Sequence, residues 1–475
     1  DYILEADVQI TSGTEAGLIF RASDLAVGAD SLEGYFLGIN AQSQYAVLGQ
    51  FSEGKWTEIA SRKIPVKYNE NYHLKVVLSE GHIQAYINDN PLNRNPYPKF
   101  DLVSNTHLST GKIGFRTWHA DAAFDNVKVT PYKEEVTGQT YTNSVMPGIA
   151  DPYVLYHEGT YYLYGTHTED WPMMQNGIKV YTSTDLVNWK EHDEWALHRD
   201  NSWGENRFWA PEVIEKDGKF YMYYAVEERL AVATSDSPLG PFVQEKMEPI
   251  HPNTPEIDAH IFTDEDGKQY MYFVRFEGGN VIYVAELNDD MKSIKEDTVT
   301  FVMRASQDWE KSTKQPSYPV NEGAFVIKHK DTYYLTYSAN HFESPDYGVG
   351  YATAKTPMGP WTKYENNPIM KSNIVVPGAG HHSLIHSPDG TELFMVYHTH
   401  NSTKATEPRK LAIDRVQFVP QENGPDIMEV WGPTVTPQPM PSNNKMLESV
   451  QLQSEKNTLV RYETSNLAVS GQLKN

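Results

Sequence analysis

The chain has 475 residues, which is too long for a single hydrophobic core and indicates two or three domains. Its 63 acidic and 40 basic side chains give a net charge of −23, which disfavours nucleic acids and anionic membranes as partners, because both attract basic surfaces. There is no cysteine, which excludes disulfides, thiolate catalysis and cysteine-based zinc sites. No apolar run approaches the roughly 20 residues of a membrane-spanning helix.

The first third of the chain contains short alternating strands separated by turn residues, and no helical periodicity competes with them. This pattern predicts an antiparallel β-sandwich over residues 1–133. Trp118, beside His119 and Asp121, is a candidate sugar-contacting lip, although a buried core tryptophan is the favoured interpretation. The expected strands are 2–10, 16–24, 35–41, 44–51, 73–89, 111–118 and 124–131.

Four segments of this region carry a resemblance to a known fold family: GLIFRASD (17–24), GYFLGIN (34–40), HLKVVLSEGHIQAYIND (73–89) and GKIGFRTWHADAAFDNVKV (111–129). They resemble concanavalin-like jelly rolls, and among these the family 66 carbohydrate-binding modules. The resemblance implies a β-sandwich that binds glycan. A sandwich that only supports its neighbouring domain is the equal alternative.

Between about residues 145 and 420 the chain repeats one pattern five times, in which an apolar strand enters a polar turn and a tyrosine-rich strand returns. The copies are 150–164, 210–224, 258–273, 322–337 and 381–397, and each continues into further strands. Regular repeats of a small all-β unit predict a β-propeller, here with five blades over residues 142–433. The recurring Trp189, Phe242 and Trp361 are interpreted as packing anchors between blades.

The heads of the repeats differ in a way that predicts chemistry. Asp151, Asp258 and Glu322 stand at the head of their first strands, and His381 holds that place in the fifth copy. The first strand of each propeller blade lines the central channel, so these side chains should face one another. Three such carboxylates cannot all stay ionised at ordinary pKa values, which yields a protonated acid beside an ionised base. That pairing is what glycosidic bond cleavage requires.

Six motifs resemble those of glycoside hydrolase family 43, in the order of that family: ADPYV (150–154), WAPEV (209–213), IDAHIF (257–262), NEGAFVIK (321–328), GAGHHS (378–383) and KLAIDRVQF (410–418). The resemblance implies a five-bladed propeller that hydrolyses arabinose- or xylose-containing plant polysaccharides with inversion of configuration. It also implies Asp151 as general base, Glu322 as general acid and Asp258 as a third carboxylate that orients Glu322. Inversion needs base and acid about 6.5–9.5 Å apart to admit a water.

By the same resemblance, His381 corresponds to an axial histidine near a water-coordinated calcium ion, and no organic cofactor is expected. Calcium prefers oxygen ligands, so one histidine plus waters is an unusual shell, and a hydrogen-bonded histidine without metal stays open. The neighbouring His382 competes for the same role.

Three further residues are candidates for substrate binding. Trp209, at the strand head of the second blade, is a candidate stacking wall for a sugar, with buried packing as its alternative. Arg415 is a candidate donor to substrate hydroxyls or a partner in a salt bridge. His260 follows Asp258 by two residues, which strand alternation places on the same face.

The leading functional hypothesis is an exo-acting α-L-arabinofuranosidase, with a β-xylosidase or bifunctional enzyme close behind and an arabinanase next. Fructan-cleaving five-bladed families use motifs such as NDPNG, which this chain lacks. A non-enzymatic glycan-binding propeller is the alternative outside enzymes. A secreted or cell-surface location is expected, and the oligomeric state is left open.

The last part of the chain is expected to leave the propeller. Residues 419–441 are rich in proline and should wrap the propeller or form a linker. Residues 434–475 are assigned to a linker and a partial further module, with strands at 447–453 and 457–463.

Overall fold

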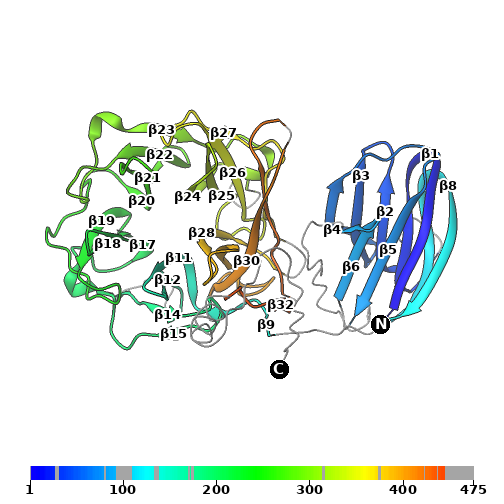
Figure 1. Ribbon diagram of the computed structural model, residues 1–475, viewed down its shortest axis with the longest axis horizontal. Helices are drawn as coiled ribbons and strands as arrows, with labels where there is room; N and C mark the ends of the chain where they lie inside the picture. Colours follow the sequence, from blue (N-terminus) through cyan, green and yellow to red (C-terminus); the bar gives the residue numbers. More distant parts are fainter. Residues whose placement is uncertain are drawn as a thin grey trace, which may run out of the picture.

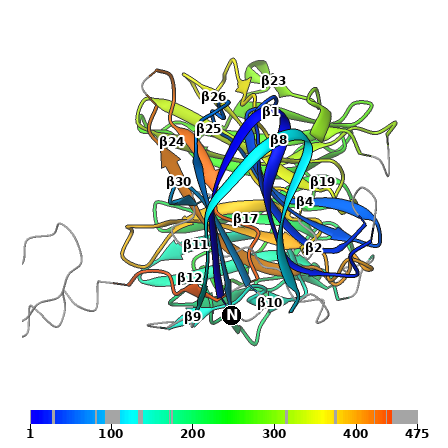
Figure 2. The ribbon, with the colours of Figure 1, turned by 90° about the vertical axis from the view of Figure 1, so that its right-hand side faces the viewer.

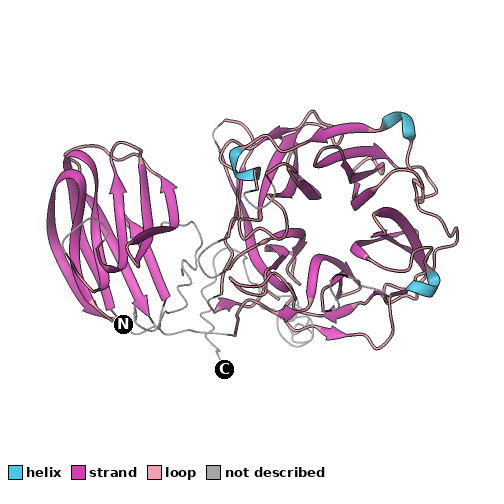
Figure 3. Ribbon diagram, turned by 180° about the vertical axis from the view of Figure 1, so that it is seen from behind, coloured by secondary structure: helices cyan, strands magenta, loops and turns pink. Residues whose placement is uncertain are grey.

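The computed structural model shows two all-β bodies side by side, a ring and a sandwich (Figure 1). It describes residues 2–26, 31–79, 82–91, 110–132, 139–169, 172, 176–312, 316–372, 376–421, 423–435 and 437–443. Strands dominate both bodies (Figure 3), and the described part of the chain contains no helix long and apolar enough to cross a membrane. Its helices are short 3-10 turns: η2 (Arg199–Asn201), η3 (Glu296–Thr298) and η4 (Asp308–Glu310).

The sandwich is built from one continuous sheet that folds over on itself. Its strands are β1 (Tyr2–Ser23), β2 (Glu33–Asn40), β3 (Tyr45–Ser52), β4 (Lys55–Lys63), β5 (Tyr72–Ser79), β6 (His82–Ile87), β7 (Asn90–Pro91) and β8 (Lys112–Pro131). The first half of β1 pairs with β5 and the second half with β2, while β8 runs along the whole of β1 (Figure 2). The long strand thus belongs to both layers, and the core lies between them.

Two pairs of predicted strands are in fact single long strands. The expected strands 2–10 and 16–24 are both part of β1, and 111–118 and 124–131 are both part of β8. Register shifts interrupt their pairing near Gly13 and His119, whose φ angles are +86° and +46°. A bulge bends a strand without ending it, which alternation alone does not reveal. The core position favoured for Trp118 is wrong, because this side chain is 40% exposed.

The ring is a five-bladed β-propeller, as the repeats predict. Its blades consist of β11 (Ile149–His157), β12 (Thr160–His167), β14 (Tyr181–Ser183) and β15 (Lys190–Glu191); β17 (Trp209–Lys216), β18 (Lys219–Val226) and β19 (Arg229–Ser235); β20 (Glu256–Thr263), β21 (Gln269–Phe276), β22 (Asn280–Glu286) and β23 (Thr300–Met303); β24 (Asn321–His329), β25 (Thr332–Ala339), β26 (Gly348–Ala354) and β27 (Thr362–Lys363); and β28 (Gly380–His386), β29 (Leu393–Thr399) and β30 (Lys410–Val419). A short hairpin, β13 (Gly177–Ile178) and β16 (Leu197–His198), accompanies the first blade.

The tyrosine-rich second strands of the repeats join each blade to the next. Four buried tyrosines donate their hydroxyl groups to backbone carbonyls of the following blade: Tyr164 to Pro238, Tyr223 to Met291, Tyr272 to Pro357 and Tyr334 to Asp426. The apolar clusters also lie between neighbouring blades, and Phe242, Trp361 and Trp189 pack against three of them. A tyrosine suits this position because its ring fills the interface while its hydroxyl finds a partner.

The ring closes through the two ends of the propeller segment. β10 (Met146–Pro147) and β31 (Ile427–Val430) both pair with β30, and β9 (Thr140–Tyr141) pairs with β32 (Gln438–Pro439). The proline-rich stretch therefore wraps the propeller, and Ser442 still bonds to Glu392. The strands expected at 447–453 and 457–463 lie outside the described residues.

Asn143 strengthens this closure, because its side-chain amide acts as a strand partner for β30. Its Oδ1 accepts from the Ile413 amide at 2.9 Å and its Nδ2 donates to the Ile413 carbonyl at 2.8 Å. Asn143→Ala leaves the buried Ile413 amide unpaired, whereas the Ile413 carbonyl keeps the Tyr141 hydroxyl as a donor, and we expect a loss of about 1–3 kcal/mol in the free energy of unfolding. Thermal unfolding measures this, with the exposed Asn366→Ala as control. A melting temperature equal to that of the control would contradict this account of closure.

Candidate active site

The first strand of every blade carries the same β-bulge near its start. One extra residue interrupts the pairing with the second strand in all five blades. The residues in the left-handed conformation, with φ between +42° and +57°, are Asp151, Ala210, Asp258, Gly323 and His381. Only one of the five is a glycine, although the other side chains are strained there, and such strain is typical of functional sites.

The bulge corrects the alignment of the repeats by one residue in the fourth blade. The residue equivalent to Asp151 and Asp258 is Gly323, whereas Glu322 pairs with Ser338 just before the bulge. Glu322 therefore enters the channel from a slightly different position than the two aspartates.

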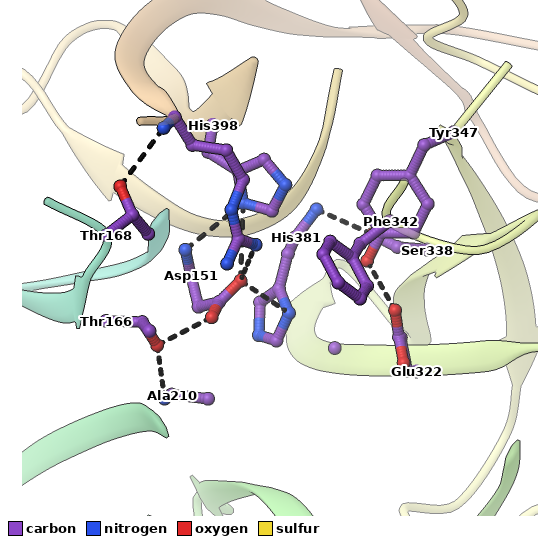
Figure 4. Close-up of polar contacts among 12 residues, drawn as sticks. Asp151, Thr166, Thr168, Ala210, Glu322, Ser338, Phe342, Tyr347, His381 and His398 are labelled. Carbon is purple, nitrogen blue, oxygen red and sulfur yellow. Dashed lines mark hydrogen bonds and ion pairs between the residues drawn. The ribbon is translucent and has the colours of Figure 1, made fainter. Parts of the chain in front are cut away.

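A side chain of a neighbouring blade binds the bulge amide in four of the five blades. These amides donate as follows: Asp151 to His398 Nδ1 at 3.1 Å, Ala210 to Thr166 Oγ1 at 2.9 Å, Gly323 to Asp258 Oδ2 at 3.2 Å and His381 to Ser338 Oγ at 2.8 Å. Figure 4 shows three of these contacts around Asp151 and His381. The strand heads are thus fixed to one another around the channel.

Asp151 is the most strongly bound of the three carboxylates. Its Oδ1 lies 3.2 Å from both His381 Nδ1 and an Arg409 guanidinium nitrogen, and its Oδ2 accepts from the Thr166 hydroxyl at 2.6 Å. Burial raises the pKa of this carboxyl, but the charges of His381 and Arg409 outweigh burial and hold the pKa well below its usual range. Asp151 is therefore ionised at any working pH.

His381 is the histidine that faces the carboxylates. Burial lowers its pKa, but the negative charges of Asp151, Asp258 and Glu322 outweigh burial and raise the pKa above its usual value. His382 instead bonds to Thr336 within the wall, and burial lowers its pKa to about 3. Of the two histidines, His381 is thus the one that faces the channel carboxylates, and the calcium-related role of either stays a prediction.

His398 is a neutral neighbour of this charged group. Burial lowers its pKa to about 3, and its Nδ1 accepts the Asp151 amide proton, which requires an unprotonated nitrogen. Its ring lies parallel to that of Tyr347, with centroids 5.7 Å apart.

Asp258 is the carboxyl whose protonation is most altered. Burial above all, with the charges of Glu322 and Asp151, raises its pKa from 3.8 to about 7, although His381 and the Gly323 amide act in the opposite direction. Among the described residues no hydrogen bond joins the carboxyl groups of Asp258 and Glu322. Asp258 instead accepts from the backbone amide of Gly323, the residue after Glu322, and its role in orienting Glu322 stays a prediction.

Glu322 is held by two neutral donors. The Tyr347 hydroxyl donates to its Oε1 at 2.8 Å, and the Asn280 amide donates to its Oε2 at 2.7 Å. The side chain is buried, and both donors come from neighbouring positions on the channel wall.

Two predicted substrate-binding residues lie outside the channel. Arg415 forms a salt bridge with Glu392 at 2.7 Å, as one of its two predicted roles required. It lies on β30, five residues after the first residue of that strand, and away from the channel. His260 is buried, with Nδ1 against Glu212 and Nε2 accepting from the Val326 amide. The bulge between Ile257 and His260 breaks the alternation on which its prediction depended.

Trp209 occupies the position in its blade that Glu322 occupies in the fourth. It is partly buried against the core, with the Arg207 guanidinium 5.6 Å from its ring centre. A sugar-stacking role for Trp209 stays a prediction.

Sequence reasoning missed four residues that complete the site: Arg409, Thr166, Tyr347 and Asn280. Arg409 had a usable signal, since it stands directly before a fifth-blade strand that starts at the mouth. The others lie on second or third strands or in a loop, and their contacts depend on residues distant in the sequence, so no local pattern marks them.

The structure leaves the calcium prediction for His381 untested. Within the described ranges there is no group of three or more histidine, aspartate or glutamate side chains arranged to hold a metal ion. Since the His381 Nδ1 already faces Asp151, these residues do not form a protein-built oxygen cage of the kind that calcium prefers.

Comparison with known proteins gives the family of each domain. The family model described as glycosyl hydrolases family 43 matches residues 141–423, and that of the 3-keto-alpha-glucoside-1,2-lyase-like domain matches residues 1–130. The chain is 30% identical over 297 residues to a protein of Aspergillus niger named beta-D-galactofuranosidase, covering 58% of this chain and 82% of the relative. It is 26% identical over 291 residues to a xylosidase/arabinosidase of Bacteroides ovatus, covering 52% and 86%.

A solved structure titled a thermostable family-43 glycoside hydrolase is 43% identical, with a TM-score of 0.59, and covers 64% of this chain and all of that one. The match for residues 1–130 confirms the lectin-like jelly roll of the first domain, though under a different family description from the carbohydrate-binding modules of the sequence prediction. Glycan binding by this domain stays a prediction.

The bulge in the fourth blade yields a test of the channel geometry. A Cβ at Gly323 would lie 3.1 Å from the His381 ring, and its φ of +57° disfavours any side chain. We expect Gly323→Ala to lower kcat at least about tenfold, because it displaces His381 from the carboxylates. Ala210→Gly, at the equivalent bulge in the second blade, is the matched control and should keep both activity and stability. Wild-type kcat in Gly323→Ala would refute the tight approach of these two residues.

The raised pKa of Asp258 yields a test of stability against pH. In the folded protein Asp258 binds its proton more tightly than in the unfolded chain, so its contribution to stability is lost as pH rises from about 4 to about 7. Asp258→Asn removes this loss, and we expect its melting temperature to exceed that of the wild type at pH 8 but less so at pH 5. A difference of about 2–4 °C corresponds to each kcal/mol in a domain of this size. Equal differences at both pH values would show that Asp258 does not titrate in this range.

Proposed function

The chain belongs to glycosyl hydrolase family 43, and from this premise we propose that it removes terminal α-L-arabinofuranosyl units from plant cell-wall polysaccharides or oligosaccharides. Membership of the family makes it a hydrolase of glycosidic bonds. The observation that supports the proposal most is the convergence of Asp151, Asp258 and Glu322 on His381 at the centre of the ring.

The proposed reaction is a single displacement with inversion at the anomeric carbon. Asp151 accepts a proton from a water whose oxygen bonds to that carbon, while the bond to the leaving oxygen breaks and Glu322 gives that oxygen its proton. Both carboxyl groups are then restored by proton exchange with water after the product leaves.

The environment of each carboxyl fits its proposed part. A pKa well below the usual range makes Asp151 a weak base, so its contribution is a fixed negative charge and an oriented acceptor rather than high basicity. Asp258 keeps its proton up to about neutral pH and therefore adds no second negative charge beside the reacting centre. The Tyr347 and Asn280 donors fix the orientation of Glu322 by binding one carboxyl oxygen each.

A β-xylosidase activity, alone or combined, is the second candidate. The relative from Bacteroides ovatus carries both activities in its name, and the relative from Aspergillus niger is named for a different furanose. Arabinofuranose and galactofuranose share the five-membered ring, which favours the furanosidase as the first choice. Arabinanase and non-catalytic glycan binding remain outcomes of the assay.

The proposal is tested with 4-nitrophenyl α-L-arabinofuranoside, 4-nitrophenyl β-D-xyloside and linear arabinan as substrates. We expect hydrolysis of the arabinofuranoside, and a fall in kcat of about 10²–10⁴-fold in both Asp151→Asn and Glu322→Gln with the fold intact. His260→Gln serves as a comparison for loss of packing. Lack of hydrolysis of all three substrates by the folded protein, or wild-type kcat in either carboxylate variant, would overturn the assignment.

A further inference from the structure

A groove of about 470 Å³ lies at the seam where the ring closes, between β10 of the fifth blade and β12 and β14 of the first. This volume is in the range of small-molecule binding sites, which is about 300–1,000 Å³. The groove is separate from the channel, since its lining includes none of the residues that face His381. It is lined by Met146, Pro147, Gly148, His167, Glu169, Asn176, Gly177, Lys179, Tyr181, Glu191 and Trp195.

Three aromatic rings lie next to one another in this groove, with the Trp195 ring tilted by 59° from that of His167. The His167 ring lies 6.0 Å from that of Tyr181 and 6.2 Å from that of Trp195, and its Nε2 meets the Tyr181 hydroxyl at 3.1 Å. The Lys179 ammonium lies 5.0 Å from the centre of the Trp195 ring. Aromatic faces of this kind pack against the C–H faces of sugars.

The polar groups of the groove favour a neutral ligand with many hydroxyls. Glu169, Glu191 and Asn176 supply acceptors and an amide, and Lys179 is already paired with Glu191. Two carboxylates against one ammonium, on a chain of net charge −23, disfavour a polyanion such as a uronic acid polymer or a phosphate ester.

The wall of the groove is linked to the proposed base, Asp151, through Arg409. The Gly148 amide donates to the Arg409 carbonyl at 2.8 Å, and the Arg409 guanidinium binds Asp151. Gly148 precedes Asp151 by three residues, which spans about 10 Å of extended chain. A polymer held in the groove would therefore lie close to the channel mouth.

We infer that this seam groove is a second glycan subsite, which binds a neutral pentose chain of the polymeric substrate outside the channel, with Trp195 as its stacking platform. The inference rests on the proposed function for the identity of the polymer. It predicts that the groove contributes to the hydrolysis of polymers and not to that of small glycosides.

The test compares the wild type with Trp195→Ala on soluble arabinoxylan, linear arabinan and 4-nitrophenyl α-L-arabinofuranoside. We expect kcat/KM on the better polymer to fall about tenfold, mainly through KM, which equals the loss of one good stacking contact. The small glycoside should change less than about twofold and thereby show that the variant is folded. Phe301→Ala, an exposed aromatic of the third blade, is the matched control and should leave both substrates unaffected.

An unchanged rate on the polymers, or an equal fall on polymer and small glycoside, would overturn the inference. Should Trp195→Ala fail to fold, Lys179→Met replaces it with the same expected selectivity. If the wild type hydrolyses none of the substrates, the proposed function fails, and electrophoresis in gels containing arabinoxylan or arabinan tests the groove alone. Retardation of the wild type that is lost in the variant supports the groove, and equal migration of the two proteins contradicts it.

Discussion

The compensation of buried negative charge by His381 is the interaction on which the rest of the site depends. Three carboxyl groups from three blades meet in the channel with little exposure to solvent, and each would be costly to ionise there without a positive partner. Their combined negative charge raises the pKa of His381, so this histidine is protonated. Together with Arg409, the protonated His381 allows Asp151 to stay ionised. At Asp258 the effect of burial is not fully compensated. Its pKa is raised to about 7, and it keeps its proton up to about neutral pH. The division into an ionised and a protonated carboxyl thus follows from where the single imidazolium lies.

The propeller provides this arrangement through a backbone feature rather than through the strands themselves. The repeated bulge places one residue per blade in the left-handed conformation, and the bulge amides are bound across blade boundaries. Because each strand head is fixed by its neighbour, the channel side chains form one connected set. The tyrosine hydroxyls of the second strands also bind the following blade. The tyrosine-rich strand that marks each repeat in the sequence therefore also holds the blades together.

Much of this could be predicted from the sequence, because repeats report on blades and unusual strand heads report on a channel. Asp151, Asp258, Glu322 and His381 were found in this way. Arg415 forms the salt bridge that was one of its two alternatives, and His260 lies off the predicted face, since strand alternation carries no information about bulges. Arg409 and Asn280 act across blades, and Thr166 and Tyr347 reach their carboxylates from other strands or loops of the same blade, so none of these contacts has a local sequence pattern. The seam groove could not be predicted either, because it forms only where β10 and β31 pair with β30.

The most direct test of the central claim is the charge state of the channel histidines, read from ¹⁵N chemical shifts of histidine-labelled protein across pH, with His381→Gln and His398→Gln to assign the signals. The account predicts that His381 carries its proton at pH values where an ordinary histidine, of pKa about 6.5, has lost it. It also predicts that His398 stays neutral with a protonated Nε2 throughout the range in which the protein is folded. A neutral His381 at pH 6, or a positively charged His398, would contradict the account.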